Sequence, residues 1–303
     1  MTKPSLLKAK KPSLENPGHI KCVIFGRSGV GKTWLALNFP KPFYIDCEGG
    51  ARLAHYQQKL IESGGGYYGP QQGANDLDNI IEQISALASE KHDYKTLIID
   101  SITKPWLTEI TNEQERLGDR DAFGASKKPA VAKMRRLINW IGRLDMNCFL
   151  IAHEVAEWGM VGNERKEIGK APDIYEKLIY ELDLTLQVRA HSATRRDAIV
   201  YKTRLTGFPH NDVIILQDGT DKGYESIAER YGRDFIEAEN KAIELATDWQ
   251  VARIKALFDA LNLTEDQISK GLSKKNAETV EDLSTEEAQT IIADIEKKLT
   301  APN

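Results

Sequence analysis

One eight-residue stretch constrains the fold of this chain more than any other. It follows the short apolar run 22–25 and fits the spacing Gly-x-x-x-x-Gly-Lys-[Ser/Thr], with the residues Gly26, Arg27, Ser28, Gly29, Val30, Gly31, Lys32 and Thr33. This is the spacing of a phosphate-binding loop, in which backbone N–H groups at a helix N-terminus converge on an anion. A buried strand before the motif and the helix-forming run 34–37 after it favour such a loop over a chance glycine-rich turn.

The residues of this loop predict its chemistry. Lys32 is expected to reach the β- and γ-phosphates of a nucleoside triphosphate, and the hydroxyl of Thr33 is expected to bind Mg²⁺. The predicted nucleotide-binding set is the whole loop together with the next residue, Trp34. ATP and Mg²⁺ are therefore the expected cofactors.

Composition indicates a globular protein. The chain has 303 residues, of which 41% are hydrophobic, and this length suggests one large domain and a smaller one. No apolar run reaches about 18 residues and no secretory signal begins the chain, so we expect a cytoplasmic protein without a membrane partner. Cys22, Cys47 and Cys148 lie on or beside predicted core strands without metal-ligand spacing, which predicts reduced core thiols.

Apolar strands alternate with helical patterns along the first two thirds of the chain. Strands are expected at 22–25, 43–46, 96–100, 148–152, 184–189, 198–204 and 213–216, and helices at 77–87, 105–117 and 131–144. Residues 63–70 and the long polar stretch 155–177 are expected to be loops. Alternation of this kind predicts an α/β fold around a mostly parallel central sheet.

Four segments follow from changes in composition. Residues 1–18, with Lys3, Lys8, Lys10 and Lys11, are expected to form a flexible basic arm, and residues 19–225 the core. A linking helix is expected at 226–246. Capping-box patterns beginning at Thr247, Thr264 and Ser284 then predict a small acidic three-helix domain at 247–303.

Asp100 ends the apolar strand 96–100, as the carboxylate of a Walker B strand does. At the tip of a strand beside the phosphate-loop strand, such a carboxylate can hold Mg²⁺ next to Thr33. Strands also end in aspartate for reasons of turn formation. The complete phosphate loop upstream favours the metal-binding interpretation of Asp100.

Four further positions or segments indicate a more specific resemblance. Glu48 follows the strand 43–46, which is expected to neighbour the phosphate-loop strand, and the equivalent RecA-family glutamate polarises the attacking water. Residues 97–101, Leu-Ile-Ile-Asp-Ser, resemble the RecA-type Walker B segment, and His153 occupies the place of a γ-phosphate sensor that is commonly glutamine. Residues 201–204, Tyr-Lys-Thr-Arg, resemble the Lys-x-Arg strand of the RadA and DnaB branches, whose cations reach a neighbouring subunit's nucleotide.

Over residues 19–220 the chain more closely resembles the phage single-strand annealing ATPases, which are short RecA-like recombinases. The resemblance implies a RecA-like P-loop ATPase core that works as a ring or filament of identical chains on single-stranded DNA. It further implies strand annealing or pairing in phage recombination, in the cytoplasm of a bacterial host. A single-strand-binding protein is the expected helper, through the C-terminal helical domain.

The resemblance implies a catalytic set of Lys32, Glu48, Asp100 and His153, with Lys202 and Arg204 as fingers acting on a neighbour. Structural, non-catalytic roles stay open for these residues. Glu48 fits a surface turn before two glycines, and His153 fits a half-buried histidine with a structural partner. Lysine and arginine two residues apart on one strand face also suit a solvated edge strand.

Six residues are predicted to bind DNA. Cations would line a groove for the phosphate backbone while one indole stacks on a base, and the set is Lys127, Lys128, Trp158, Arg165, Lys166 and Lys170. A solvated loop is the alternative. Rival functions are a helicase or recombination mediator, and a nucleotide-gated interaction protein that hardly hydrolyses ATP. A small-molecule kinase would need an arginine-rich lid, which the sequence does not offer.

Overall fold

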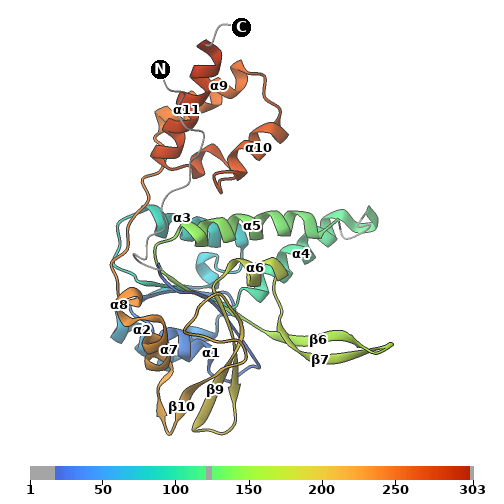
Figure 1. Cartoon of the computed structure of the whole chain (residues 1–303), viewed down its shortest axis with the longest axis vertical. Coiled ribbons are helices and arrows are strands. Elements are labelled where there is room, and N and C mark those ends of the chain that lie inside the picture. Colours follow the sequence, from blue (N-terminus) through green and yellow to red (C-terminus); the bar gives the residue numbers. More distant parts are fainter. Residues whose placement is uncertain (1–17, 121–124, 301–303) are drawn as a thin grey trace.

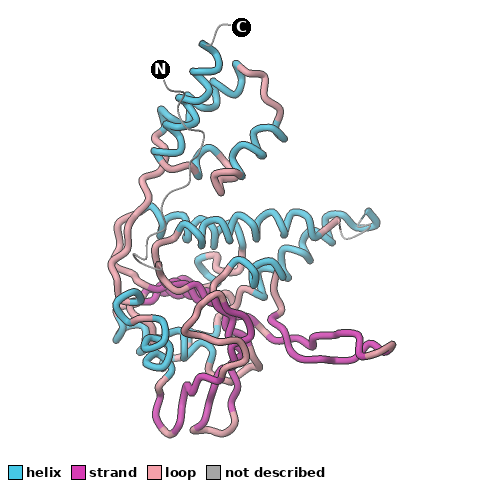
Figure 2. Tube along the Cα trace, viewed as in Figure 1, coloured by secondary structure: helices cyan, strands magenta, loops and turns pink. Residues whose placement is uncertain are grey.

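The structure is a computed structural model that describes residues 18–120 and 125–300. The predicted basic arm, apart from Gly18, and residues 121–124 lie outside this range. The described chain has an α/β core with a central sheet and a smaller group of helices at its C-terminal end (Figures 1 and 2). This confirms the predicted fold class.

The central sheet is mostly parallel. Its parallel strands are β1 (Lys21–Phe25), β2 (Pro42–Asp46), β3 (Gly66–Tyr68), β4 (Thr96–Asp100), β5 (Asn147–Ala152) and β8 (Leu184–Ala190). Antiparallel strands extend the sheet beyond β8, namely β9 (Arg195–Thr203), β10 (Val213–Asp218) and β11 (Thr220–Asp221). The prediction of a loop at 63–70 is wrong at β3, whose three residues are too few to show a strand period.

Strand order differs from the expectation at the phosphate loop. The order is β11-β10-β9-β8-β1-β5-β4-β2-β3, so β1 lies between β5 and β8. The prediction that the strands carrying Asp100 and Glu48 neighbour β1 is therefore wrong. A crossover helix can connect two parallel strands that are not adjacent in the sheet. Sequence patterns therefore predict parallel strands but do not predict the order in which they lie. Both carboxyl-terminal ends still lie at the edge of the sheet that carries the phosphate loop.

Helices cover both faces of the sheet (Figure 1). One core contains residues of α3 (Leu77–Ser89), α4 (Thr103–Leu117) and α5 (Lys127–Arg143), and the other contains residues of α1 (Lys32–Leu37), α2 (Ala54–Ser63) and α7 (Gly223–Tyr231). Successive strand residues alternate between the cores, since Val23 faces the first core and Ile24 the second. The three cysteines are buried and free.

The polar stretch after β5 is structured, so its prediction as a loop is wrong. It forms the antiparallel hairpin of β6 (Glu154–Val161) and β7 (Glu164–Pro172), followed by α6 (Glu176–Glu181). The hairpin projects from the core (Figure 1). Its polar residues are mixed at irregular spacing with exposed apolar ones, including Trp158, Met160 and Ile168, so it lacks the regular alternation that identifies a half-buried strand.

The predicted linking helix at 226–246 is also wrong. α7 ends before Gly232, whose φ is +110°, and only α8 (Arg233–Ile236) follows it before an extended segment. That segment is held to the core, where the Ile243 amide donates to the Ala88 carbonyl oxygen at 2.7 Å. The charged residues had suggested a helix. The segment is extended instead, and its backbone forms hydrogen bonds with the core.

Three helices follow at the C-terminal end, namely α9 (Asp248–Ala260), α10 (Glu265–Ser273) and α11 (Thr285–Thr300). Thr247 and Thr264 accept hydrogen bonds from the amides of Gln250 and Gln267, as the capping boxes predicted. These helices enclose their own small core, which includes Ile254, Leu283 and Ile292. The short 3-10 helices are η1 (Gly50–Arg52), η2 (Pro70–Gln72), η3 (Gly118–Arg120) and η4 (Val280–Asp282).

Among residues 18–120 and 125–300, no helix combines the length and the apolar character that crossing a bilayer requires.

Candidate nucleotide site

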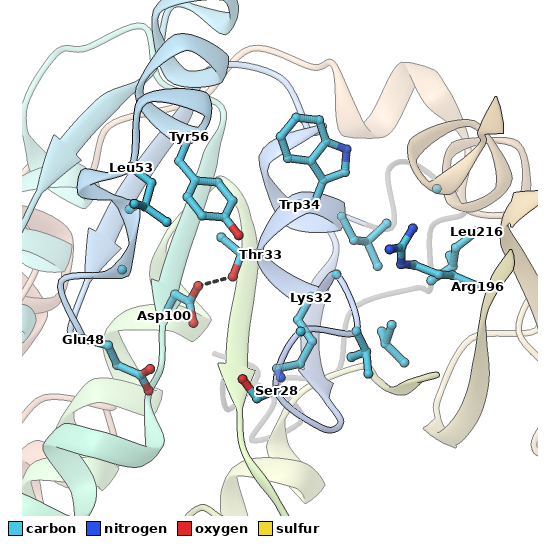
Figure 3. A pocket seen from close by; sticks show the side chains of 18 of the residues that line it. Ser28, Lys32, Thr33, Trp34, Glu48, Leu53, Tyr56, Asp100, Arg196 and Leu216 are labelled. Atoms are coloured by element: carbon cyan, nitrogen blue, oxygen red, sulfur yellow. Dashed lines mark hydrogen bonds between the residues drawn. The ribbon is translucent and has the colours of Figure 1, made fainter. Parts of the chain in front are cut away.

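A cavity of about 640 Å³ opens above the phosphate loop (Figure 3). Ser28, Gly29, Val30, Gly31, Lys32, Thr33 and Trp34 all line it. The predicted partners Glu48, Asp100 and His153 line it as well. The structure therefore brings the predicted nucleotide-binding and catalytic residues to one place, from the ends of β1, β2, β4 and β5.

Glycine is required at the start of the loop. Gly26 has a φ of +148°, and a Cβ atom on it would lie 2.4 Å from the carbonyl oxygen of Val188 in β8. The turn brings the Gly26 and Arg27 carbonyl oxygens within 2.8 and 2.9 Å of the Lys32 ammonium, which donates to both. Burial lowers the pKa of Lys32, and the nearby carboxylates of Asp100 and Glu48 oppose this shift. The loop thus preorganises a cation at the floor of the cavity.

Three oxygen-bearing side chains meet beside the loop. The Thr33 hydroxyl donates to Asp100 Oδ2 at 2.5 Å, and the Tyr44 hydroxyl donates to the same oxygen at 2.9 Å. Burial raises the pKa of Asp100 above its ordinary value, and both hydrogen bonds oppose the rise. A hydroxyl and a carboxylate side by side are hard oxygen donors of the kind Mg²⁺ prefers, so this pair fits the expected ion. Sequence reasoning missed Tyr44, which reads as an ordinary core aromatic.

Glu48 is positioned by a tight turn after β2. The buried carboxylate of Asp46 accepts hydrogen bonds from the amides of Glu48, Gly49 and Gly50 at 3.2, 2.7 and 3.2 Å, and from Ala51 at 2.9 Å. This network points the Glu48 side chain to the cavity (Figure 3). Sequence reasoning missed Asp46, although an aspartate three residues before a glycine pair is a turn-forming signal.

His153 and Glu48 are in direct contact. Nε2 of His153 lies 2.7 Å from Glu48 Oε1, and the Ser101 hydroxyl donates to the same oxygen at 2.5 Å. The backbone amide of His153 donates to Thr103 Oγ1 at 3.0 Å, which anchors the end of β5 to the start of α4. Both side chains stay accessible, with exposed fractions of 51% for His153 and 40% for Glu48. The predicted base and the predicted sensor therefore form one unit at the mouth of the cavity.

Trp34 lies on the solvent side of the cavity. Its indole N–H donates to Asp221 at 2.9 Å, and its ring centroid lies 6.4 Å from that of Tyr56. Tyr56 and Leu53 also line the cavity and were not singled out from the sequence. Leu53 directly precedes α2 and Tyr56 lies in its first turn, and this helix was not predicted from the sequence.

Lys202 and Arg204 lie far from the cavity of their own chain. Thr203 pairs with Leu184 at the beginning of β8, so the end of β9 reaches the edge of the sheet opposite the phosphate loop. The Lys202 ammonium donates to the Leu182 carbonyl oxygen, and Arg204 Nη1 donates to the Glu181 carbonyl oxygen at 3.0 Å. Burial is the main cause that lowers the pKa of Lys202, followed by the charge of Arg204. Their action on a neighbouring subunit stays a prediction.

The six predicted DNA-binding residues lie on two elements. Trp158, Arg165, Lys166 and Lys170 belong to the β6–β7 hairpin, whereas the exposed Lys127 and Lys128 begin α5. The Arg165 guanidinium lies 5.9 Å from the Trp158 ring centroid. Lys166 pairs with Glu164 at 2.6 Å and Lys170 with Glu167 at 2.5 Å, so carboxylates partly offset the hairpin's positive charge.

Comparison with known proteins supports the nucleotide-binding core. The crystal structure of the RadB recombinase is similar to this chain with a TM-score of 0.45 and 16% identity, over 67% of this chain and 88% of that one. A TM-score at this level supports no argument about function. A search of curated proteins found no match. A family model described as an AAA domain matches residues 19–220, a range that contains the phosphate loop, Glu48, Asp100 and His153. Since this match spans well over half of the sequence, the chain belongs to the AAA domain family.

Proposed function

We propose that this protein hydrolyses ATP and binds single-stranded DNA, and that it promotes strand annealing in phage recombination. The observation that carries the ATPase part is the meeting of Lys32, the Thr33–Asp100 pair and Glu48 on one cavity. A phosphate binder without hydrolysis would need the loop and Lys32. It would not need a carboxylate held at the cavity mouth.

The chain's own residues suggest how the reaction proceeds. The loop amides and Lys32 bind the phosphates, and Thr33 and Asp100 would hold Mg²⁺, which neutralises charge on phosphate oxygens when it is bound. Glu48 accepts a proton from the water whose oxygen attacks the γ-phosphorus. The bond to the β-phosphate oxygen breaks, and ADP and phosphate leave. His153, 2.7 Å from Glu48, would orient the carboxylate and serve as the γ-phosphate sensor.

The hairpin supports the DNA-binding part of the proposal. Trp158 is 54% exposed although it is a large aromatic residue, and exposed aromatic side chains are the usual platforms for unpaired bases. His153 directly precedes β6, so the residue that touches Glu48 is joined by backbone to the hairpin. Nucleotide hydrolysis and DNA contact are coupled through this junction.

The finer assignment rests on the resemblance of residues 19–220 to phage annealing ATPases. Under this proposal, identical chains assemble on DNA, and Lys202 and Arg204 serve a neighbour's nucleotide. The C-terminal helices would contact a single-strand-binding protein. An annealing assay with complementary oligonucleotides tests this part. Unwinding of a forked duplex without annealing would replace it with the helicase alternative.

Substitution of Glu48 by Gln tests the hydrolytic step. We expect Glu48→Gln to lower kcat by about 10²–10⁴-fold while ATP affinity is retained, because the amide cannot accept the proton. Turnover is measured with and without single-stranded DNA. Glu62→Gln on the exposed surface of α2 is the matched control and should turn over ATP like the parent protein. A slow rate of ATP turnover that neither DNA nor the Glu48→Gln substitution changes would favour a nucleotide-gated interaction protein.

A further inference from the structure

We propose that Arg196 binds the nucleoside end of the nucleotide, which makes the cavity selective for nucleotides over bare polyphosphates. This inference rests on the proposed function and assigns a residue to that same site. The sequence predicts functional cations at the end of β9, in Lys202 and Arg204. The structure places a different cation of this strand, Arg196 near its beginning, at the cavity.

Strand direction explains the placement of Arg196. β8 is parallel to β1, and Gln187 pairs with Phe25, the last residue of β1. β8 then continues to Ala190, which pairs with Arg196 in the antiparallel strand β9. The start of β9 therefore lies past the carboxyl-terminal end of β1, beside the phosphate loop. Arg196 lines the cavity, as do Leu216 and Gln217 of β10.

Arg196 packs directly on the last glycine of the loop. Its Cδ and Nε atoms lie 3.3 Å from the position that a Cβ atom on Gly31 would take. Nη1 donates to Gln217 Oε1 and to the Ala193 carbonyl oxygen, the latter at 3.5 Å. Nε is buried and has no hydrogen-bond partner within residues 18–120 and 125–300. Because Nε is packed on the loop, a ligand would be contacted by the part of the guanidinium that lines the cavity, whose planar shape suits stacking on a base.

The arrangement of the cavity indicates which part of the nucleotide Arg196 meets. Thr33 and Asp100 lie on one side of Lys32, and Arg196 and Leu216 lie on the other (Figure 3). The Thr33–Asp100 side corresponds to the metal and the β- and γ-phosphates. The opposite wall then faces the nucleoside end. Arg196 offers a flat guanidinium that can stack on a base, and Leu216 adds apolar surface beside it.

A purely structural role makes a different prediction. If Arg196 only supported the phosphate loop against β10, its loss would loosen the loop for every phosphate ligand. If it contacts the nucleoside, its loss would weaken the binding of nucleotides and spare inorganic tripolyphosphate. Comparison of these ligands therefore separates the two roles.

The experiment measures equilibrium binding of ATP, ADP and inorganic tripolyphosphate to the full chain in the presence of Mg²⁺. We expect Arg196→Ala to weaken ATP and ADP by about tenfold or more, the scale of a lost charge-assisted contact, while tripolyphosphate changes less than about twofold. Arg195→Ala is the matched control, because Arg195 is the exposed neighbour on the same strand. It should bind all three ligands within about twofold of the parent protein.

Several outcomes would overturn the inference. They are an equal loss for tripolyphosphate, an equal loss in Arg195→Ala, or parental ADP affinity in Arg196→Ala. If Arg196→Ala does not fold, Arg196→Lys keeps the charge and the aliphatic stem but lacks the planar fork, and it should show the same selective loss. If Arg196→Lys binds all three ligands with the affinity of the parent protein, a nucleoside contact by Arg196 is likewise rejected. Failure of the parent protein to bind ATP would instead reject the proposed function itself.

Discussion

At the residue scale, Gly26 is where the phosphate loop leaves least room for a side chain. We expect Gly26→Ala to lower the free energy of unfolding by about 3 kcal/mol or more, because strain at positive φ adds to a clash with the Val188 carbonyl. Gly29→Ala is the control, since its φ of +76° strains alanine but nothing lies within 4 Å of the new Cβ. It should cost about 1 kcal/mol. Urea denaturation measures both, and equal losses would contradict the packing argument.

Asp100 should make the protein less stable at neutral pH than an uncharged residue would. Its pKa is raised in the folded state, so folding favours the protonated carboxyl, and the penalty on the ionised form grows as pH rises through that pKa. We therefore expect Asp100→Asn to raise Tm at about pH 7.5 and to raise it less at about pH 5, while ATP hydrolysis is lost.

Asp93→Asn is the control for this pH dependence. The hydrogen bond and charge of Lys41 lower the pKa of the exposed Asp93, so the shift has the opposite sign. Its replacement should give no gain in Tm at either pH. A lower Tm for Asp100→Asn at neutral pH would show that the lost carboxylate contacts outweigh the relief from burial.

At the scale of elements, the β6–β7 hairpin carries the DNA-binding proposal. Trp158→Ala should weaken affinity for single-stranded DNA by about 1–3 kcal/mol, the value of one stacked base, and leave DNA-independent ATP hydrolysis unchanged. Trp249→Ala in α9 is a matched control, because this tryptophan is 64% exposed and lies in the C-terminal helices. Fluorescence anisotropy with an oligonucleotide provides the measurement. Equal losses of DNA affinity in the two variants would contradict the proposal that the hairpin binds DNA.

At the scale of the whole molecule, arginines of α5 hold the C-terminal helices to the core. Arg143 donates to the Asp282 carbonyl oxygen and lies 3.8 Å from Glu287, and Arg136 pairs with the Asp282 carboxylate at 3.3 Å. We expect Arg143→Ala to loosen this contact and to speed proteolysis of the extended segment 237–247 by about tenfold. Arg116→Ala is the control, because the exposed Arg116 pairs with Glu113 within α4, and this variant should be cleaved at the parental rate. Unchanged cleavage in Arg143→Ala would show that apolar packing holds the helices instead.

Local patterns were sufficient to predict the α/β class, the phosphate loop and most core strands. Each depends on neighbours in sequence: the loop spacing places glycines, Lys32 and Thr33 within one turn, and the capping box at Thr247 needs only Gln250 three residues later. Asp100 was predicted for the same reason, since it ends a short apolar strand, whereas Glu48 was predicted from the resemblance to the RecA family. The hairpin at 154–172 and the extended segment after α8 were missed because their polar residues have no diagnostic period.

Long-range pairing required the three-dimensional structure. Strand order places β5 between β1 and β4, and the antiparallel direction of β9 brings Arg196 to the cavity while carrying Lys202 and Arg204 to the far edge. The contact of His153 with Glu48 likewise joins residues more than a hundred positions apart. Hydrogen-bond registers between distant strands create these neighbours, and no local pattern encodes a register between segments so far apart.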